Sequence, residues 1–362
     1  MQIIIDNIIQ TWWNIDSPPI VSLIVGAVML SLLICFLFGV YSCVNYIASN
    51  FWQANIASDV YEANWIWAVL KRKLGNNFDR LPAIFSAVLE QQSDCIAAFL
   101  GVLSAWAACL FLPWSASHCN LPSQVALSGF YNQADLLCFF GFISIACLPE
   151  LALFLQNKKQ LYLQDLLWQK LSWLGVFFIA CLGPVVLANS LSVSEIVKNQ
   201  AEGMFGFSWL GLYFIPCFLG TATAIICFYN WQHNLNSAYA QMTATNAYSP
   251  PSRFLIKLTG NFTFFALTCL FILLFVGGWN VPNLIYPAYI NLGFLIASDV
   301  DLVCGLLVFI LKLIILTALW PYLYNYLKKR PQLSFSTSLT LAILNLFFCL
   351  ILAIFNATYV GG

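Results

Sequence analysis

Long apolar stretches alternate with shorter polar segments along most of the chain. A helix needs about 20 mostly apolar residues to cross a bilayer, because its backbone N–H and C=O groups must be satisfied within the segment. Eight stretches fit this pattern, and we predict that each forms a transmembrane helix. They are Ile20–Ile47, Cys95–Trp114, Asp135–Leu155, Leu171–Leu187, Phe205–Phe228, Phe254–Phe275, Leu302–Leu323 and Phe335–Ala357.

The composition agrees with this pattern. Of the 362 residues, 61% are hydrophobic and 8% are charged, whereas about 25% are charged in an ordinary soluble domain. The first 19 residues contain no Lys or Arg, so the positive region of a cleavable signal peptide is missing and we expect Met1 to be retained. The predicted protein is an all-α polytopic membrane protein whose single integral membrane domain covers residues 1–362. We expect contact with membrane lipid and no nucleic-acid partner.

The positive charges are distributed unevenly between the loops. Short cytoplasmic loops retain Lys and Arg, whereas translocated loops do not. The odd-numbered loops and their edges hold nearly all of them, and the even loops and both tails hold only Lys198. This alternation predicts an even number of helices with both termini on the outer side. The cations of the odd loops are Lys71, Arg72, Lys73, Arg80, Lys158, Lys159, Lys170, Arg253, Lys257, Lys328, Lys329 and Arg330.

Two of the cytoplasmic or matrix-side segments are unusual. Residues 59–94 mix charges with apolar residues, and the spacing in WIWAVLKRKL favours an amphipathic helix on the membrane surface. The loop 229–253 is polar, yet YNWQHNLNSAYAQMTATNAYSPPS, from Tyr229 to Ser252, contains no Asp, Glu, Lys or Arg.

Two ionisable residues lie well inside predicted spans, where such residues suggest a function. Glu150 follows Pro149 in the third span, and Lys312 lies near the middle of the seventh. Pairing with a carboxylate and proton or substrate chemistry are both open for Lys312. Its candidate partners are Glu150, Glu195, Asp299 and Asp301.

Other chemistry has little support in the sequence. The 13 cysteines contain no C-x-x-C pair, and the two histidines, His118 and His233, lie far apart, so we predict no metal site. Motifs for nucleotide binding or a serine hydrolase are missing. We expect no cofactor bound by this chain.

Two segments resemble a known family. VVLANSLSVSEIVKNQ, Val185 to Gln200, is similar to the segment between the fourth and fifth helices in the H subunit of respiratory complex I, also called subunit 1 of NADH:quinone oxidoreductase. LLFVGGWNVP, Leu273 to Pro282, is similar to that family's motif at the outer end of helix six, and Lys312 falls where the family has a lysine. The resemblance implies a subunit at the junction with the peripheral arm, in the bacterial or mitochondrial inner membrane. It implies other complex I-like subunits as partners and quinone as the substrate of the complex.

Several acidic residues of that family have no counterpart here. QKLSW, Gln169 to Trp173, resembles a family stretch that continues with a glutamate, but Leu174 follows here. The family's acidic loop falls on Trp231 to Tyr248 without any acid, Gly260-Asn261 replace a helix-six glutamate, and Ala48-Ser49-Asn50 replace Glu-Arg-Lys. Neutral amides and hydroxyls cannot store a proton as carboxylates do. We therefore expect proton coupling through this subunit to be weakened or rerouted.

The resemblance also supplies site candidates. Trp231, His233, Tyr239, Tyr248 and Arg253 are the quinone-proximal candidates, and Glu150 and Lys312 are the proton-path candidates. The loop could instead be a contact surface for a soluble subunit.

Two other functions remain open. One is the anchoring membrane subunit of a hydrogenase-type complex, in which loss of quinone-site acids is less surprising. The other is a stand-alone secondary transporter that uses Glu150 and Lys312, although the sequence shows no inverted repeat.

Overall fold

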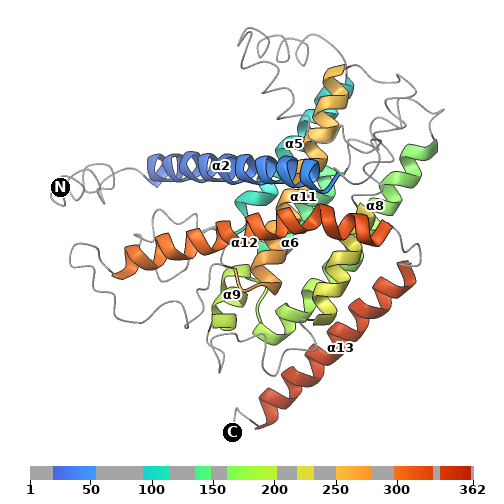
Figure 1. Ribbon diagram of the computed structural model, residues 1–362. Helices are drawn as coiled ribbons and strands as arrows, with labels where there is room; N and C mark the ends of the chain where they lie inside the picture. Colours follow the sequence, from blue (N-terminus) through green and yellow to red (C-terminus); the bar gives the residue numbers. More distant parts are fainter. Residues whose placement is uncertain are drawn as a thin grey trace, which may run out of the picture.

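Helices form every regular element that the computed structural model describes (Figure 1). The described residues are 19–53, 93–113, 135–147, 161–201, 218–231, 250–278, 297–328 and 335–359. The labelled helices are α2 (Pro19–Gln53), α5 (Ser93–Leu110), α6 (Asp135–Ala146), α8 (Leu161–Ala188), α9 (Val193–Ala201), α11 (Pro250–Phe275), α12 (Ala297–Lys328) and α13 (Phe335–Tyr359). One further helix is Phe218–Trp231. The all-α prediction is confirmed for this part of the chain.

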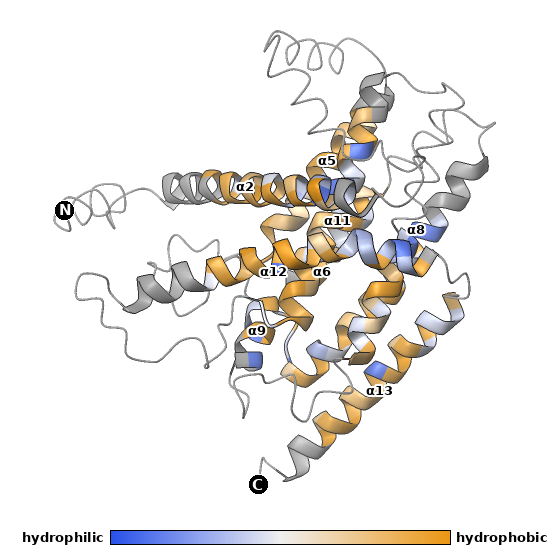
Figure 2. Ribbon diagram, in the orientation of Figure 1, coloured by the Kyte–Doolittle hydropathy of each residue, from blue (hydrophilic) through white to orange (hydrophobic). Residues whose placement is uncertain are grey.

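Apolar residues cover most of the length of the described helices (Figure 2), and these helices follow the order of the predicted spans along the chain. Five are long and apolar enough to cross a membrane: Leu30–Ser49, Trp168–Ala188, Phe254–Phe275, Gly305–Leu327 and Phe335–Ile354. Three others are shorter: Ile96–Leu110, Leu136–Ala146 and Phe218–Trp231. Length and composition therefore indicate a multi-pass helical membrane protein.

Helix boundaries differ from the predicted spans mainly at the polar ends. α8 begins at Leu161, ten residues before the predicted start, because a helix can continue through polar residues outside the apolar layer. The helix Phe218–Trp231 continues past Phe228, and α11 begins at Pro250. Both helices thus enter the predicted loop 229–253, of which residues 232–249 lie outside the described part. The predicted amphipathic segment 59–94 also lies outside it, apart from two residues that begin α5.

α11 is the central helix. Almost every residue from Phe262 to Phe275 is buried, and α5, α9 and α12 all pack against α11. α2 packs along α12, and this pair runs across the view of Figure 1, whereas α11 runs more nearly from top to bottom. The pair and the central helix therefore cross.

α8 and α13 make a second close contact. Pro184 lies inside α8 and has no N–H to donate to the carbonyl of Ala180, four residues earlier. The Asn345 Nδ2 atom of α13 donates to this oxygen at 3.1 Å. Gly183 makes room, because a Cβ there would lie 2.8 Å from Asn345 Nδ2. A neutral amide from α13 thus provides a donor where the proline interrupts α8.

Candidate functional site

The end of α11 is built by two glycines. Gly277 and Gly278 have φ angles of 76° and 50°, in the left-handed region that glycine adopts without steric cost. The Gly278 N–H donates back to the Ile272 carbonyl at 2.9 Å. The chain therefore leaves the helix immediately after Phe275, and the last carbonyl groups need donors from elsewhere.

α9 lies next to the end of α11 and follows α8 after a short turn. Asn189, with a φ of 51°, ends α8, and Glu195 lies in the first turn of α9, where its charge suits the helix dipole. The Ser190 hydroxyl donates to the Glu195 carboxylate and so fixes the turn between the two helices. This short helix was not predicted as a separate element.

Gln200 connects α9 to α11. Its Nε2 atom donates to the Leu274 carbonyl at 2.9 Å, and the side chain is 8% exposed. α9 also packs closely on the glycine turn, because a Cβ on Gly278 would lie 2.9 Å from the Val197 side chain. The Gln200 Oε1 atom is buried and has no hydrogen-bond partner within the described part of the chain. Gln200 was not a site candidate, although the Gly-Gly pair after an apolar run predicts a helix end that needs donors.

Lys312 provides the other donor. Its Nζ atom donates to the Val276 carbonyl at 2.9 Å and to the Gly278 carbonyl at 2.8 Å. Lys312 lies seven residues after Gly305, where the apolar stretch of α12 begins, or roughly 10 Å along the helix. α11 therefore ends beside an interior turn of α12, well away from the ends of that apolar stretch.

The arrangement explains how a cation is tolerated at this position. The C-terminal end of a helix carries the equivalent of about half a negative charge. Its carbonyls are strong acceptors, and an ammonium group has three donors. Pairing with a carboxylate was one of two readings of Lys312. The structure places hydrogen bonds from its Nζ atom to two backbone carbonyls, and Glu195 accepts from Ser190. The side chains of Asp299 and Asp301 are outside the described part, as is Glu150.

Trp231 lies in a different place. It ends the helix Phe218–Trp231, is 2% exposed, and has the Lys170 Nζ atom 5.9 Å from its ring centroid, a cation–π contact. Gly220, near the start of this helix, packs against Phe275, so Trp231 lies roughly 16 Å further along the helix from the end of α11. The structure therefore separates this quinone-proximal candidate from Lys312.

The remaining candidates are described only in part. Arg253 lies in the first turn of α11, with its side chain outside the described part. His233, Tyr239 and Tyr248 lie outside it altogether. Leu174, which stands where the resembling family has a glutamate, is buried in the hydrophobic core.

Within the described residues, no group of three or more His, Cys, Asp or Glu side chains could hold a metal ion. The described cysteines are all free thiols. No protein-family model matches the chain, and no curated protein matches it. The candidate site is thus defined by its geometry, a helix end held by one amide and one ammonium group.

Proposed function

We propose that this chain is a divergent H-type membrane subunit of a complex I-like NADH:quinone oxidoreductase, in a bacterial or mitochondrial inner membrane. In this proposal eight helices cross the membrane and both termini face outward. One observation carries it. The two segments that resemble the family, Val185–Gln200 and Leu273–Pro282, contact each other through Gln200 and the Leu274 carbonyl, and Lys312 contacts the second segment.

This convergence supports the resemblance because similarity of sequence alone does not require the segments to meet. The resemblance rests on residue pattern alone, and 74 residues separate the two atoms of the Gln200 bond in sequence. Lys312 is a further 34 residues from Gly278. Three unrelated positions would not be expected to meet at one helix end.

The proposed role is to form the membrane side of a quinone chamber and the junction with the peripheral arm. Electron transfer belongs to partner subunits, and this chain holds no redox cofactor. Trp231, His233, Tyr239, Tyr248 and Arg253 are proposed to face the quinone-entry side. Such groups can hydrogen-bond to a quinone carbonyl or pack on its ring, but the neutral ones do not replace tuned carboxylates in a proton relay.

Lys312 is proposed to act as a fixed positive charge at the end of α11. Its two carbonyl contacts hold α11 and α12 together at this point. Proton movement through this subunit is therefore proposed to be weakened, or rerouted past the missing acids.

Co-purification tests the proposed assembly. The full chain, tagged at one terminus and extracted in mild detergent, is expected to bring antiporter-like and iron–sulfur subunits with it. A nickel-site hydrogenase subunit in their place would instead establish the hydrogenase-type anchor, and a chain that purifies alone would contradict both assemblies.

Proton counting tests the proposed coupling. With the intact complex in proteoliposomes, we expect fewer protons moved per NADH than in a fully coupled enzyme. A full number of protons per NADH would contradict weakened coupling. If that number then falls when Lys312 alone is replaced, the proton path is rerouted through this residue.

A stand-alone secondary transporter is the second candidate. It is favoured by the end of α11 beside an interior turn of α12, because transporter sites are often built from helices that break within the membrane. Purified protein in liposomes without partners would decide this. Ion-driven uptake of a solute that stops in a Lys312→Met variant would favour transport over the proposed subunit role.

A further inference from the structure

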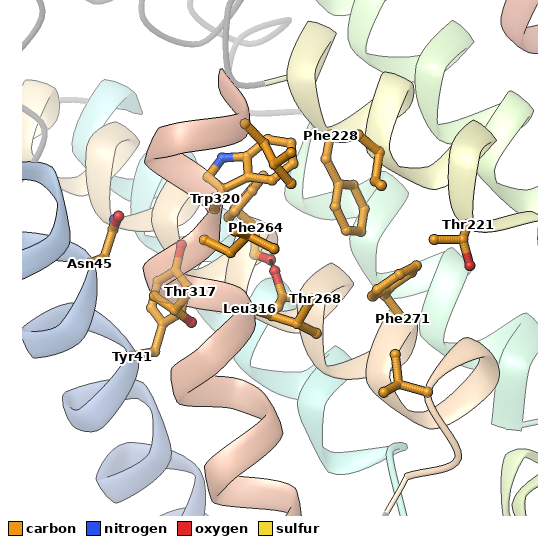
Figure 3. Close-up of a pocket in the computed structure, with 14 residues that line it drawn as sticks. Tyr41, Asn45, Thr221, Phe228, Phe264, Thr268, Phe271, Leu316, Thr317 and Trp320 are labelled. Carbon is orange, nitrogen blue, oxygen red and sulfur yellow. Dashed lines mark hydrogen bonds between the residues drawn. The ribbon is translucent and has the colours of Figure 1, made fainter. Parts of the chain in front are cut away.

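A cavity of about 250 Å³ lies where the α2–α12 pair meets α11 and the helix Phe218–Trp231 (Figure 3). The side chains of Phe228, Phe264 and Phe271 line it, and none of its 14 lining residues has a charged side chain. An apolar cavity of about 150 Å³ holds the six carbons of benzene, so this one has room for roughly ten carbons.

The cavity extends along the helices that surround it. On α11 its lining residues run from Phe264 to Val276, one residue past the end of the helix, which is roughly 18 Å along the axis. On the helix Phe218–Trp231 they run from Thr221 to Phe228, roughly 10 Å. A volume of about 250 Å³ spread over such lengths is narrow. Its shape therefore suits a chain better than a set of fused rings.

The wall of this cavity is almost entirely hydrocarbon, although several lining residues carry a polar atom. The Thr268 hydroxyl donates to the Phe264 carbonyl of its own helix at 2.8 Å. Thr317 Oγ1 and Trp320 Nε1 are buried within the protein and are not exposed on the wall. A cavity without polar partners does not hold water, and a polar group inside it would lose its hydrogen bonds. The wall therefore favours an occupant made only of carbon and hydrogen within the cavity.

The cavity reaches the outer surface of the described helices. Leu319 and Val276 line it, yet they are 42% and 37% exposed. Leu319 also continues an exposed apolar stripe on α12, in which Leu307, Leu311 and Ile315 follow one another at intervals of four residues. In a multi-pass membrane protein such a stripe faces the hydrocarbon layer. The molecules nearest to this edge of the cavity are therefore membrane lipids.

We propose that this cavity binds one acyl chain of a membrane phospholipid, which enters beside Leu319. The methylene groups pack against Phe228, Phe264 and Phe271, and the ester groups and the headgroup stay outside among the surrounding lipids. An empty space would leave these rings without contacts on one side, so the chain fills the gap between α12 and α11. This site goes beyond the proposed function, because none of the quinone-proximal candidates lines it and it does not depend on the assembly that the chain joins.

Photolabelling of the full chain in lipid nanodiscs tests the site. The probe is a phosphatidylcholine with a diazirine in the middle of one saturated acyl chain, mixed into unlabelled phosphatidylcholine. Any surrounding lipid can label the exposed stripe at Leu311 and Ile315, but only a chain inside the cavity can reach the buried rings of Phe264 and Phe271. We expect adducts, located by mass spectrometry, both on the stripe and within Phe264–Phe271.

Two filling variants test the cavity itself. Ile225→Trp and Leu316→Phe each place a larger ring at a lining position, and we expect both to lose the adducts within Phe264–Phe271. The adducts on Ile315 should remain in both variants, which shows that the variant is folded in the bilayer. Leu311→Trp is the matched control, because Leu311 lies on the exposed stripe and does not line the cavity. It should keep the adducts within Phe264–Phe271.

A second probe tests the kind of occupant. A sterol that carries a diazirine has fused rings in place of a chain, and we expect it to label the stripe without labelling Phe264–Phe271. The proposal is overturned if the acyl probe leaves Phe264–Phe271 unlabelled in the unmodified chain, or if the sterol labels this segment as efficiently. It is also overturned if Ile225→Trp and Leu316→Phe both keep the adducts there. Because the readout needs only this chain, it is independent of the co-purification that tests the proposed function.

Discussion

In two places a neighbouring helix donates hydrogen bonds to backbone carbonyls, once where a helix is interrupted and once where a helix ends, and the two places use different chemistry. In α8, Pro184 interrupts the helix and the neutral amide of Asn345 donates to the Ala180 carbonyl. At the end of α11, the amide of Gln200 and the ammonium group of Lys312 donate to three carbonyls. The donor at the first site is a neutral amide, and the donors at the second include a cation.

The donors differ in charge because the first site is an interruption within a helix, whereas the second is the end of a helix. α8 continues past Pro184, so only one carbonyl loses its helical donor and the aligned peptide dipoles run on. α11 stops, so several carbonyls lose their donors and the negative end of its dipole is left in place. A neutral donor is sufficient in the first case, whereas a cation is favoured in the second. The charge of Lys312 is thus explained by the helix end that it contacts.

The largest expected effect is at Lys312. Lys312→Met keeps the length of the side chain but leaves the Val276 and Gly278 carbonyls without this donor. We expect a loss of about 3 kcal/mol in the free energy of unfolding, because each hydrogen bond from a charged group contributes about 1.5 kcal/mol or more. Reversible unfolding in mixed detergent micelles measures it. Leu311→Met, at an exposed position on the same helix, should change this free energy by less than about 0.5 kcal/mol.

The next effect is expected at Gly278. Gly278→Ala forces a side chain into a backbone with a φ of 50° and places its Cβ 2.9 Å from Val197. We expect a loss of about 2 kcal/mol, from backbone strain and the displaced α9. Val197→Ala should restore part of this loss in the double variant, and purely additive losses would show that α9 does not press on the turn. Gly39→Ala is the control, because open space surrounds Gly39.

A smaller effect is expected at Asn345. Asn345→Leu removes a single neutral donor from the Ala180 carbonyl and should cost about 1 kcal/mol. The same unfolding measurement applies, with Leu344→Met at an exposed neighbouring position as the control. A loss as large as that of Lys312→Met would remove the distinction between the two sites.

The smallest effect is expected at Gln200. Gln200→Leu removes the bond to the Leu274 carbonyl, but it also removes the buried Oε1 atom that lacks a described partner. The two contributions oppose each other, so we expect a change within about 0.5 kcal/mol. A loss above about 2 kcal/mol would show that Gln200, rather than Lys312, holds the end of α11.

Much of the fold could be predicted from the sequence, because apolar length determines where a helix can cross a membrane. Each predicted span overlaps an apolar helix in the same order along the chain. The helix ends were less predictable, and Trp231 was assigned to a loop although it belongs to a helix. Polar residues that extend a helix beyond the membrane leave no clear signal in an apolarity pattern.

The site was only half predictable. The sequence singled out Lys312 and the two segments that meet beside it, but it could not show that they meet. The sequence offered carboxylates as partners of Lys312, whereas two of its hydrogen bonds are to backbone carbonyls, which every residue carries and no sequence pattern marks. The cavity beside Thr317 and Trp320 depends on how four helices pack, and nothing in their spacing along the chain predicts it.

The central claim is that position 312 needs a cation because it contacts a helix end. The free energy of unfolding of Lys312→Arg compared with that of Lys312→Gln tests this most directly, since Gln offers a neutral donor and Arg keeps the charge. The account predicts that Arg retains most of the stability and that Gln loses nearly as much as Met. A Gln variant as stable as the unmodified protein, with an Arg variant less stable, would contradict it.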